Sequence, residues 1–341
     1  MKVAPIVSVD WLQLNLTAPP NLVVEYHQFY KVKLMPYSTR HFKIVEEIYR
    51  DGLRIATVTR VPLSNIIKSD TILVKFDNWL LYSVPLFEYV TQFLVWNNFK
   101  FKSISRLDIC ADFQEFNNGM NPATFIKNYL YGKYLRLGRT SISNAHFKQV
   151  DTDLFFNALK FGSNLSEISI YLYNKSLEMS TIKWKPWIAD KWIKSGLSQD
   201  KDVWRLEVSI KDLNKTLVNS NSAEFAELNS LEILKDDFTK LTYHIFRDKY
   251  FSFVVKDTQV KKSRMLKLPL FSKNFSNYLI VDGTKMIAST RSDKIFIKKL
   301  EDVNNDLRGR NFDFNINIAH LKEEYINVTG LTNWAVYKGL L

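Results

Sequence analysis

The alternation of apolar and polar positions predicts short strands over the first part of the chain. A period of two marks a strand, because neighbouring side chains point to opposite faces of a sheet. Four runs have this pattern: Val7–Leu16, Phe42–Glu47, Leu53–Thr59 and Asp70–Tyr82. A helix is expected over Pro85–Asn97, where apolar residues repeat on one face and proline suits the first turn.

Residues 103–211 predict the order strand, helix, strand, strand, helix, strand. The strands are expected at Ser103–Phe113, Leu154–Phe161, Glu167–Asn174 and Asp202–Lys211. One helix begins at the Asn121-Pro122 pair, an N-cap with a first-turn proline, and the other covers Pro186–Ser195. This order is that of the split-βαβ, or ferredoxin-like, unit. We therefore expect an α+β protein with a ferredoxin-like core in a larger antiparallel sheet.

The ferredoxin-like order predicts one polar sheet face. In this topology the first and third strands lie side by side, and the fourth flanks the first. Alternation turns the apolar side chains toward the helices and gathers the polar ones on the open face. That face would carry Arg106, Asp108, Cys110, Asp112, Ser169, Tyr171, Tyr173, Lys175, Arg205, Glu207, Ser209 and Lys211. Packing does not call for so many charged groups there, so the pattern indicates chemistry or a ligand.

The chain from about residue 213 onward predicts a more helical region. Apolar positions repeat with period 3.6 over Ala223–Leu234, Asp236–Arg247 and Asp293–Leu307. We therefore divide the chain into residues 1–212, which hold the core, and a basic, largely helical region over residues 213–341. The latter contains a basic run made of Lys256, Lys261, Lys262, Arg264 and Lys267. Such a run is either a solvated face or a surface that contacts DNA.

Composition narrows the classes of protein. Lys and Arg number 47 against 35 Asp and Glu, a net charge of +12. This balance favours a polyanionic partner, nucleic acid before an anionic membrane surface, although a lysine-rich proteome is the alternative explanation. A single cysteine, Cys110, excludes a disulfide framework and a cysteine zinc site. The sequence shows no signal peptide and no apolar run long enough to span a membrane, so a cytoplasmic protein is expected.

The predicted polar face could carry phosphodiester chemistry. Asp108, Asp112 and Glu207 offer the hard oxygen ligands that suit Mg²⁺ or Mn²⁺. Such an ion would polarise a scissile phosphate. A tyrosine on the adjacent strand could attack that phosphate and hold the cut strand as an ester, with Lys175 steadying the phenolate. Each residue also has an ordinary structural role, as an ion-pair partner or as packing.

Three segments, in this order, resemble the motifs of the replication initiation factor family. These are the rolling-circle replication initiators of plasmids, integrative elements and phages, often called Rep_trans. The segments are Arg106-Leu-Asp108-Ile-Cys-Ala-Asp112, Leu172-Tyr173-Asn-Lys175-Ser-Leu-Glu178 and Trp204-Arg205-Leu-Glu207-Val. The opening Val9-Asp10-Trp11-Leu12 is similar to the family's first strand. The resemblance covers about residues 6–212 and departs at Asn174, where the family more often has an acid.

The resemblance implies a replication initiation protein, a metal-dependent nickase that cuts one DNA strand at an origin. Its tyrosine would keep the 5′ end as a phosphotyrosine and leave a 3′-hydroxyl that starts rolling-circle replication. Such enzymes are similar in sheet layout to the His-hydrophobe-His (HUH-like) nickases, but hold the metal with acids. The implied partners are duplex and single-stranded origin DNA, a host helicase and a second copy of the chain.

The resemblance also assigns roles to single residues. Tyr173 matches the nucleophile position with Lys175 beside it, and Asp108, Asp112 and Glu207 match the acidic positions. The supporting positions are Glu178, Arg106, Arg205 and Tyr171. Two tyrosines share the face, so the choice between Tyr173 and Tyr171 stays open.

Two alternatives to a nickase remain at this stage. A non-catalytic DNA-binding regulator, or a decayed initiator on the same scaffold, would need the basic surface without the tyrosine and the acids. An RNA-binding module would display aromatic residues on the first and third strands of its sheet. Cys110 and Asp112 occupy the first strand here, which disfavours that class.

Overall fold

The computed structural model describes residues 3–17, 26–137, 143–150, 153–163, 165–222 and 224–282. Its strands are β1 (Ile6–Thr17), β2 (Lys31–Leu34), β3 (Phe42–Arg50), β4 (Leu53–Pro62), β5 (Thr71–Phe76), β6 (Lys100–Phe113), β7 (Tyr134–Arg136), β8 (Ser143–Val150), β9 (Asp153–Phe161), β10 (Ile168–Asn174), β11 (Trp204–Ile210), β12 (Lys215–Asn219), β13 (Phe225–Glu227), β14 (Phe253–Val255) and β15 (Tyr278–Asp282). Its helices are α1 (Asn78–Ser83), α2 (Leu86–Trp96), α3 (Pro122–Leu130), α4 (Lys175–Thr181), α5 (Pro186–Lys194) and α6 (Asp236–Tyr250), with 3₁₀ turns η1 (Leu231–Leu234) and η2 (Lys262–Arg264).

The described residues divide into two compact units. The first contains residues 1–213 and 229–278, so it extends past the boundary predicted at residue 212 and includes α6. The second contains residues 214–228 and those from 279 onward. Its described part holds β12 and β13 and most of β15, strands of one small sheet in the order β13-β12-β15.

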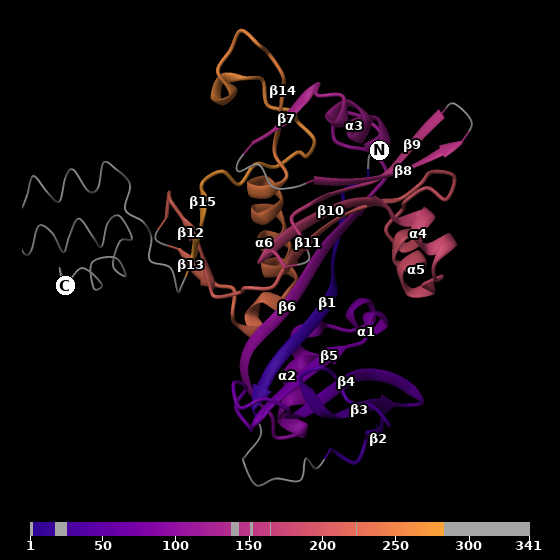
Figure 1. The fold of residues 1–341 in the computed structure, drawn as a ribbon, viewed down its shortest axis with the longest axis vertical. Helices are drawn as coiled ribbons and strands as arrows, with labels where there is room; N and C mark the ends of the chain where they lie inside the picture. Colours follow the sequence, from indigo (N-terminus) through magenta and orange to yellow (C-terminus); the bar gives the residue numbers. More distant parts are fainter. Residues whose placement is uncertain are drawn as a thin grey trace, which may run out of the picture. The chain divides into compact units, whose positions relative to one another are not determined.

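A large antiparallel sheet forms the frame of the first unit (Figure 1). Its described strands follow the order β2-β3-β4-β5-β1-β6-β11-β10-β9-β8. The long strands β1 and β6 pair along their whole length, with register shifts between Val9 and Trp11 and again near Gln13 and Asn15. Bulges of this kind increase the twist of the strands locally, so that one continuous sheet extends through both ends of the unit. The predicted α+β class with a large antiparallel sheet is confirmed.

The ferredoxin-like strand order is wrong. β11 lies between β6 and β10 and pairs antiparallel with both, so the first and third predicted strands are not neighbours. The reason is local. Asn174 ends β10 and caps α4 directly, and the N–H groups of Lys175 and Ser176 both donate to the Val203 carbonyl just before β11. The chain therefore returns beside the strand it has left, instead of crossing to the far edge of the sheet.

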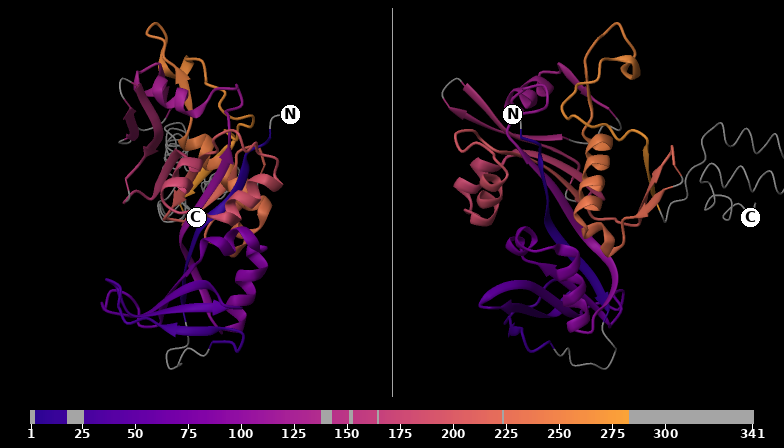
Figure 2. Two further views of the ribbon diagram at one scale, coloured as in Figure 1. Left: turned by 90° about the vertical axis from the view of Figure 1, so that its right-hand side faces the viewer. Right: turned by 180° about the vertical axis from the view of Figure 1, so that it is seen from behind.

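Helices cover both faces of the central strands (Figures 1 and 2). α6 packs against β1, β6 and β11 on the apolar face, where the aromatic contacts of Phe113 with Phe116 and Phe271 lie. α4 and α5 lie on the opposite side, and α1 packs against both β1 and α5. The sequence predicts an open polar face. In the structure, α1, α4 and α5 cover one end of that face.

Most predicted elements of the first unit are confirmed within a few residues. α2, α3, α5 and α6 lie where the periodicity places them, and Asn121 caps α3 by accepting a hydrogen bond from the N–H of Ala123. Two predictions are wrong. The strand predicted over Asp70–Tyr82 ends at Phe76 and gives way to α1. The helix predicted over Ala223–Leu234 is instead the strand β13, paired with β12, and the 3₁₀ turn η1.

The helix predicted over Asp293–Leu307 lies outside the described residues. Within the described part of the chain, the helices are all too short or too polar to cross a membrane.

Candidate functional site

The register of β6, β11 and β10 brings the predicted polar residues onto one face in rows across the sheet. Asp112, Arg205 and Tyr173 form one row, and Cys110, Glu207 and Tyr171 form the next. Asp108, Ser209 and Ser169 form the third. Directly opposed side chains on neighbouring strands lie about 5 Å apart at Cβ, so each row is a set of contacts.

The first row is a buried ion pair rather than an open site. The Arg205 guanidinium is fully buried and donates from Nε and Nη2 to the two carboxylate oxygens of Asp112, at 2.6 and 2.7 Å. Its Nη1 donates to Asp10 Oδ1 at 2.6 Å. Trp192 of α5 donates its indole N–H to Asp112 at 2.7 Å. Every strong donor of this cluster has a carboxylate partner, which is what makes burial of the charges tolerable.

Asp10 of β1 extends this cluster toward α1. The Tyr82 hydroxyl donates to Asp10 Oδ1 at 2.6 Å, and the Asn78 amide donates to its backbone carbonyl at 2.8 Å. Burial opposes ionisation of Asp10, but the charges of Arg205 and Lys175 and the Tyr82 hydrogen bond outweigh it and hold the pKa well below its ordinary value. Asp10 is therefore a permanent anion of the site.

Asp108 is also paired, but at the open end of the face. Arg106 donates from Nε and Nη2 to its two oxygens, at 3.0 and 2.5 Å. The Arg106 guanidinium carbon lies 4.3 Å from the centre of the Trp11 ring, and the Lys75 ammonium lies 3.6 Å from the same ring. Trp11 is thus held between two cations on the sheet face.

The tyrosine pair contacts Glu207. Tyr171 and Tyr173 stack with their ring centroids 4.5 Å apart, and the Tyr173 hydroxyl donates to Glu207 Oε2 at 3.2 Å. Burial and the charge of Glu207 raise the pKa of Tyr173 well above its ordinary value. Burial, followed by the charges of Asp10 and Asp108, raises the pKa of Glu207 to about 7. The Tyr173 hydroxyl therefore keeps its proton at neutral pH. Glu207, the carboxyl that accepts its hydrogen bond, exchanges its own proton near neutral pH.

Lys175 closes the inner end of this group. It is the first residue of α4, is 1% exposed, and its ammonium forms a 2.6 Å ion pair with Glu178. The same ammonium lies 5.5 Å from the centre of the Tyr173 ring. Asn174 places it there, because its side chain accepts a hydrogen bond from the Leu177 N–H and caps the helix. The departure from the family pattern at Asn174 thus has a structural role.

A cavity of about 350 Å³ opens over the outer rows of the face. Its lining residues are Arg106, Lys160, Ser169, Tyr171, Glu207, Ser209 and Lys211. Three of them are cationic and one is the carboxyl that holds the Tyr173 hydroxyl. The buried Ser209 hydroxyl has no hydrogen-bond partner among the described residues. Such a lining suits an anionic group with several oxygen atoms, such as a phosphate diester.

The three carboxylates predicted to hold a metal do not form a metal group. Both oxygens of Asp108 accept from Arg106, and both oxygens of Asp112 accept from Arg205, so Glu207 alone lacks a guanidinium partner. The described residues contain no cluster of three His, Cys, Asp or Glu side chains that could bind an ion. The residues present therefore do not fit a resident Mg²⁺ or Mn²⁺, and we derive no step through one.

Several members of the site were not singled out from sequence. The pattern of the sequence gives Asp10 only as part of a strand, places Tyr82 in a strand instead of a helix, and does not place Lys160 on the polar face. A lone acid in an otherwise apolar alternating strand was the one available signal for Asp10. The hydrogen bond from Tyr82 depends on α1, which the apolar pattern of residues 70–82 hides.

The basic run lies in the segment between β14 and β15. Lys256, Lys261, Lys262, Arg264 and Lys267 are all exposed, and three of them lie in or beside η2. β14 pairs with β7, and the Lys256 N–H donates to the Lys133 carbonyl, which fixes the start of the segment. The structure therefore presents these charges to solvent, as either interpretation of the run requires.

Comparison with known proteins gives similarity to solved structures. No protein-family model matches the chain, and no curated protein sequence matches it. Among solved structures, it is similar to a rolling circle replication initiator protein from Geobacillus stearothermophilus. The two chains are 14% identical, the match covers 78% of this chain and 93% of the other, and the TM-score is 0.45.

Proposed function

We propose that this protein cuts one strand of DNA by attack of a tyrosine hydroxyl on a phosphodiester. The observation that carries the proposal is the hydrogen bond of the Tyr173 hydroxyl to Glu207, a carboxyl that lines a cavity together with three cationic side chains. Such a reaction needs a nucleophile, a base whose pKa lies near the working pH, and a site for the anionic substrate.

The cavity would hold the scissile phosphate. Arg106, Lys160 and Lys211 surround it from three different strands or strand ends, so positive charge faces the phosphate from several sides. This positive charge attracts the phosphate and stabilises the further negative charge that develops on the phosphate oxygens as the bond breaks. Arg106 is already oriented by Asp108, which reduces the cost of ordering it.

Glu207 would act as the general base. The Tyr173 oxygen forms a bond to phosphorus, its proton passes to Glu207 Oε2, and the bond from phosphorus to the 3′ oxygen breaks. The leaving oxygen takes a proton from solvent and becomes a 3′-hydroxyl, while the 5′ phosphate stays on Tyr173. A carboxyl with a pKa of about 7 suits this exchange at neutral pH. Tyr171, stacked on Tyr173, would position the ring.

Trapping of the covalent adduct tests this assignment. Native protein incubated with supercoiled DNA should give nicked DNA and a protein–DNA adduct whose phosphotyrosine maps to residue 173 by mass spectrometry. Tyr173→Phe should remove the adduct and keep the fold, while the matched variant Tyr171→Phe should retain the modification on Tyr173. An adduct on Tyr171 would assign the attack to the other tyrosine.

Initiation of rolling-circle replication at an origin is the finer form of this proposal. Its support is the order of the three sequence motifs, with Tyr173, Lys175 and Glu207 at the matching positions. Supercoiled plasmids carrying the DNA that flanks the gene supply the test, because nicking should concentrate at one position of one strand. Nicking spread evenly over both strands would argue against an origin-specific enzyme.

A dependence on Mg²⁺ or Mn²⁺ stays a prediction from the sequence. Its test is the nicking reaction after exhaustive chelation and again after each ion is restored. The arginine partners of Asp108 and Asp112 are the reason to test it separately from the tyrosine chemistry.

A non-catalytic DNA-binding protein is the second candidate. It draws on the burial of Tyr173, which is 8% exposed, and on the use of Asp112 and Arg205 in a core ion pair. Salt-sensitive DNA binding without any adduct, on every DNA tested, would favour this candidate.

A further inference from the structure

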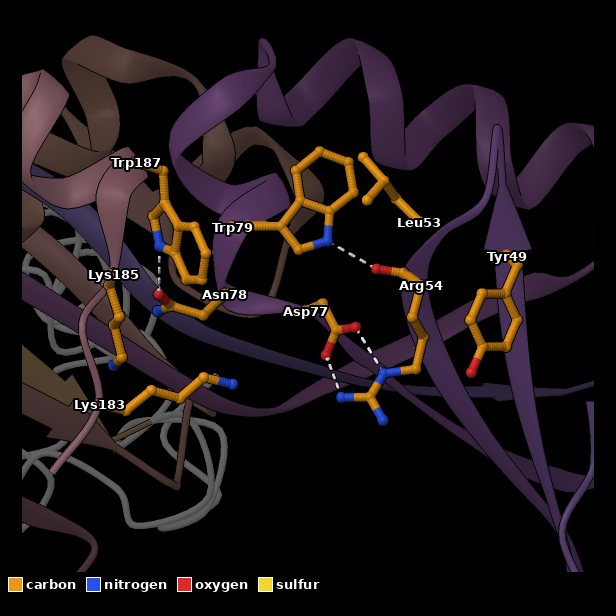
Figure 3. Close-up of a pocket in the computed structure, with 9 residues that line it drawn as sticks. All are labelled: Tyr49, Leu53, Arg54, Asp77, Asn78, Trp79, Lys183, Lys185 and Trp187. Atoms are coloured by element: carbon orange, nitrogen blue, oxygen red, sulfur yellow. Dashed lines mark hydrogen bonds and ion pairs between the residues drawn. The ribbon is translucent and has the colours of Figure 1, made fainter.

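A second cavity, of about 420 Å³, lies in the same unit and shares no lining residue with the first (Figure 3). Its lining residues are Tyr49, Leu53, Arg54, Asp77, Asn78, Trp79, Lys183, Lys185 and Trp187. They come from β3, β4, α1 with the preceding Asp77, the segment that joins α4 to α5, and the first turn of α5. None of them has a part in the chemistry proposed above, yet the cavity combines aromatic rings with cationic side chains.

The two tryptophan rings are fixed platforms. The Trp79 indole N–H donates to the Arg54 carbonyl at 2.6 Å, and the Trp187 N–H donates to Asn78 Oδ1 at 2.9 Å (Figure 3). Both rings are only half-buried, so their faces remain partly accessible. A ring held by its polar edge presents an apolar face at little entropic cost, which suits stacking on a flat ligand.

The charge of the cavity is positive where it is not already paired. Arg54 is neutralised by Asp77, with contacts of 2.6 and 3.0 Å, and by Glu47. The ammonium groups of Lys183 and Lys185 have no ion-pair partner in the part of the chain that the structure describes. Asn78, which lines the cavity, donates to Asp10, and Asp10 also accepts from Arg205, so the cavity lies beside the buried ion pair of the first row.

We propose that this cavity binds a nucleotide of the single-stranded DNA, with its base stacked on Trp79 and its phosphate on Lys183 and Lys185. The inference rests on the proposed function, since it names where the strand would be held beside the cleavage cavity. Aromatic platforms interleaved with cations are the usual means of binding single strands without reading their sequence.

Fluorescence polarisation with a labelled oligothymidylate of about 20 nucleotides tests the proposal. Trp79→Leu, and separately the pair Lys183→Gln and Lys185→Gln, should each weaken binding about tenfold, the usual order for one stacked base. The matched control is the pair Lys43→Gln and Lys68→Gln, which removes the same charge from exposed positions at the opposite end of β3 and β5 from Tyr49 and Asp77, and should change binding little. Thermal unfolding of each variant checks its fold.

An abasic oligonucleotide of the same length separates stacking from charge. Native protein should bind the abasic strand about tenfold more weakly than oligothymidylate, and Trp79→Leu should bind the two alike. Equal binding of both strands by the native protein would overturn the proposal. So would binding of thymidine monophosphate at Trp79 without binding of the strand, because a free nucleotide would then be the occupant.

The pair Lys160→Gln and Lys211→Gln distinguishes the two proposals. If this pair weakens strand binding while the Trp79 and Lys183/Lys185 variants do not, only the base pocket is overturned. If the Lys160→Gln and Lys211→Gln variant binds DNA as tightly as the native protein does, the cleavage cavity does not hold the strand, and the function proposed for it is overturned.

Discussion

Glu207 is the residue whose protonation decides the chemistry proposed here. Burial and two neighbouring carboxylates raise its pKa from 4.5 to about 7. Because the base must be ionised to accept the Tyr173 proton, the single-turnover rate of nicking should rise with pH and level off above about 7. Glu207→Gln should lower that rate by about 10²-fold or more and flatten the profile. A native profile that is flat between pH 5 and 8 would exclude this role.

The same shift predicts the pH dependence of stability. The folded state holds the Glu207 proton more tightly than the unfolded chain, so this carboxyl favours folding below about pH 4.5 and loses that contribution as the pH rises to about 7. Glu207→Gln should therefore become more stable relative to the native protein over that range, by at most about 3 kcal/mol. Urea unfolding at pH 4.5 and 8 measures the difference.

Asp108 and Asp112 occupy equivalent places in the sequence motif but have different energetic roles. Asp112→Asn would leave the fully buried Arg205 with half of its bidentate partner, at a cost of about 3–5 kcal/mol in the free energy of unfolding. Asp108→Asn should cost only about 1 kcal/mol, because the Arg106 side chain is 33% exposed. Urea unfolding followed by tryptophan fluorescence compares the two, and equal losses would contradict this distinction.

At the scale of elements, Asn174 joins the sheet to the site. As the cap of α4 it sets the position of Lys175 directly after Tyr173, so Asn174→Ala should lower stability by about 1 kcal/mol and also slow nicking. Asn121, whose side chain caps α3 by accepting from the Ala123 N–H, is the control for the loss of a cap: Asn121→Ala should lower stability by about 1 kcal/mol and leave nicking unchanged. Equal nicking by both variants would show that the cap has no part in the site.

The sequence predicted the elements better than their arrangement. The alternation in Ser103–Phe113 and Asp202–Lys211 identifies both strands and the face that each side chain takes, since that depends only on neighbouring residues. The order of strands depends on where the chain goes between them. The pattern of residues 175–203 does not distinguish a crossover of the chain from a return beside β10. Arg205 can be predicted to pair with Asp112 only if the chain returns beside β10.

The candidate site was predictable to the same degree. Tyr173 and Glu207 could be placed together because they share a sheet face, whereas Lys175, predicted on that face, is the first residue of α4. The shielding of Asp112 by Trp192 of α5 needs the packing of a helix on that face. The alternation of apolar and polar residues along a strand does not show which face of the sheet a distant helix covers.

At the scale of the whole molecule, the net charge of +12 predicts salt-sensitive DNA binding. Each phosphate neutralised contributes roughly −0.9 to the slope of log affinity against log salt. Replacing Lys261, Lys262 and Arg264 with Gln should reduce that slope by about one to three if these exposed residues contact the DNA backbone. Polarisation titrations from low to moderate salt measure it, and an unchanged slope would assign the run to a solvated surface.

The place of β11 between β6 and β10 also sets when the site can exist during synthesis. β10 emerges from the ribosome with both tyrosines, but Glu207 and Arg205 follow about thirty residues later, and β6 pairs with β11 across almost a hundred residues of chain. Contacts so distant in sequence form late in folding. A nascent or prematurely ended chain that stops before residue 204 therefore displays tyrosines without their base, and the capacity to cut DNA arises only once the sheet has closed around its last central strand.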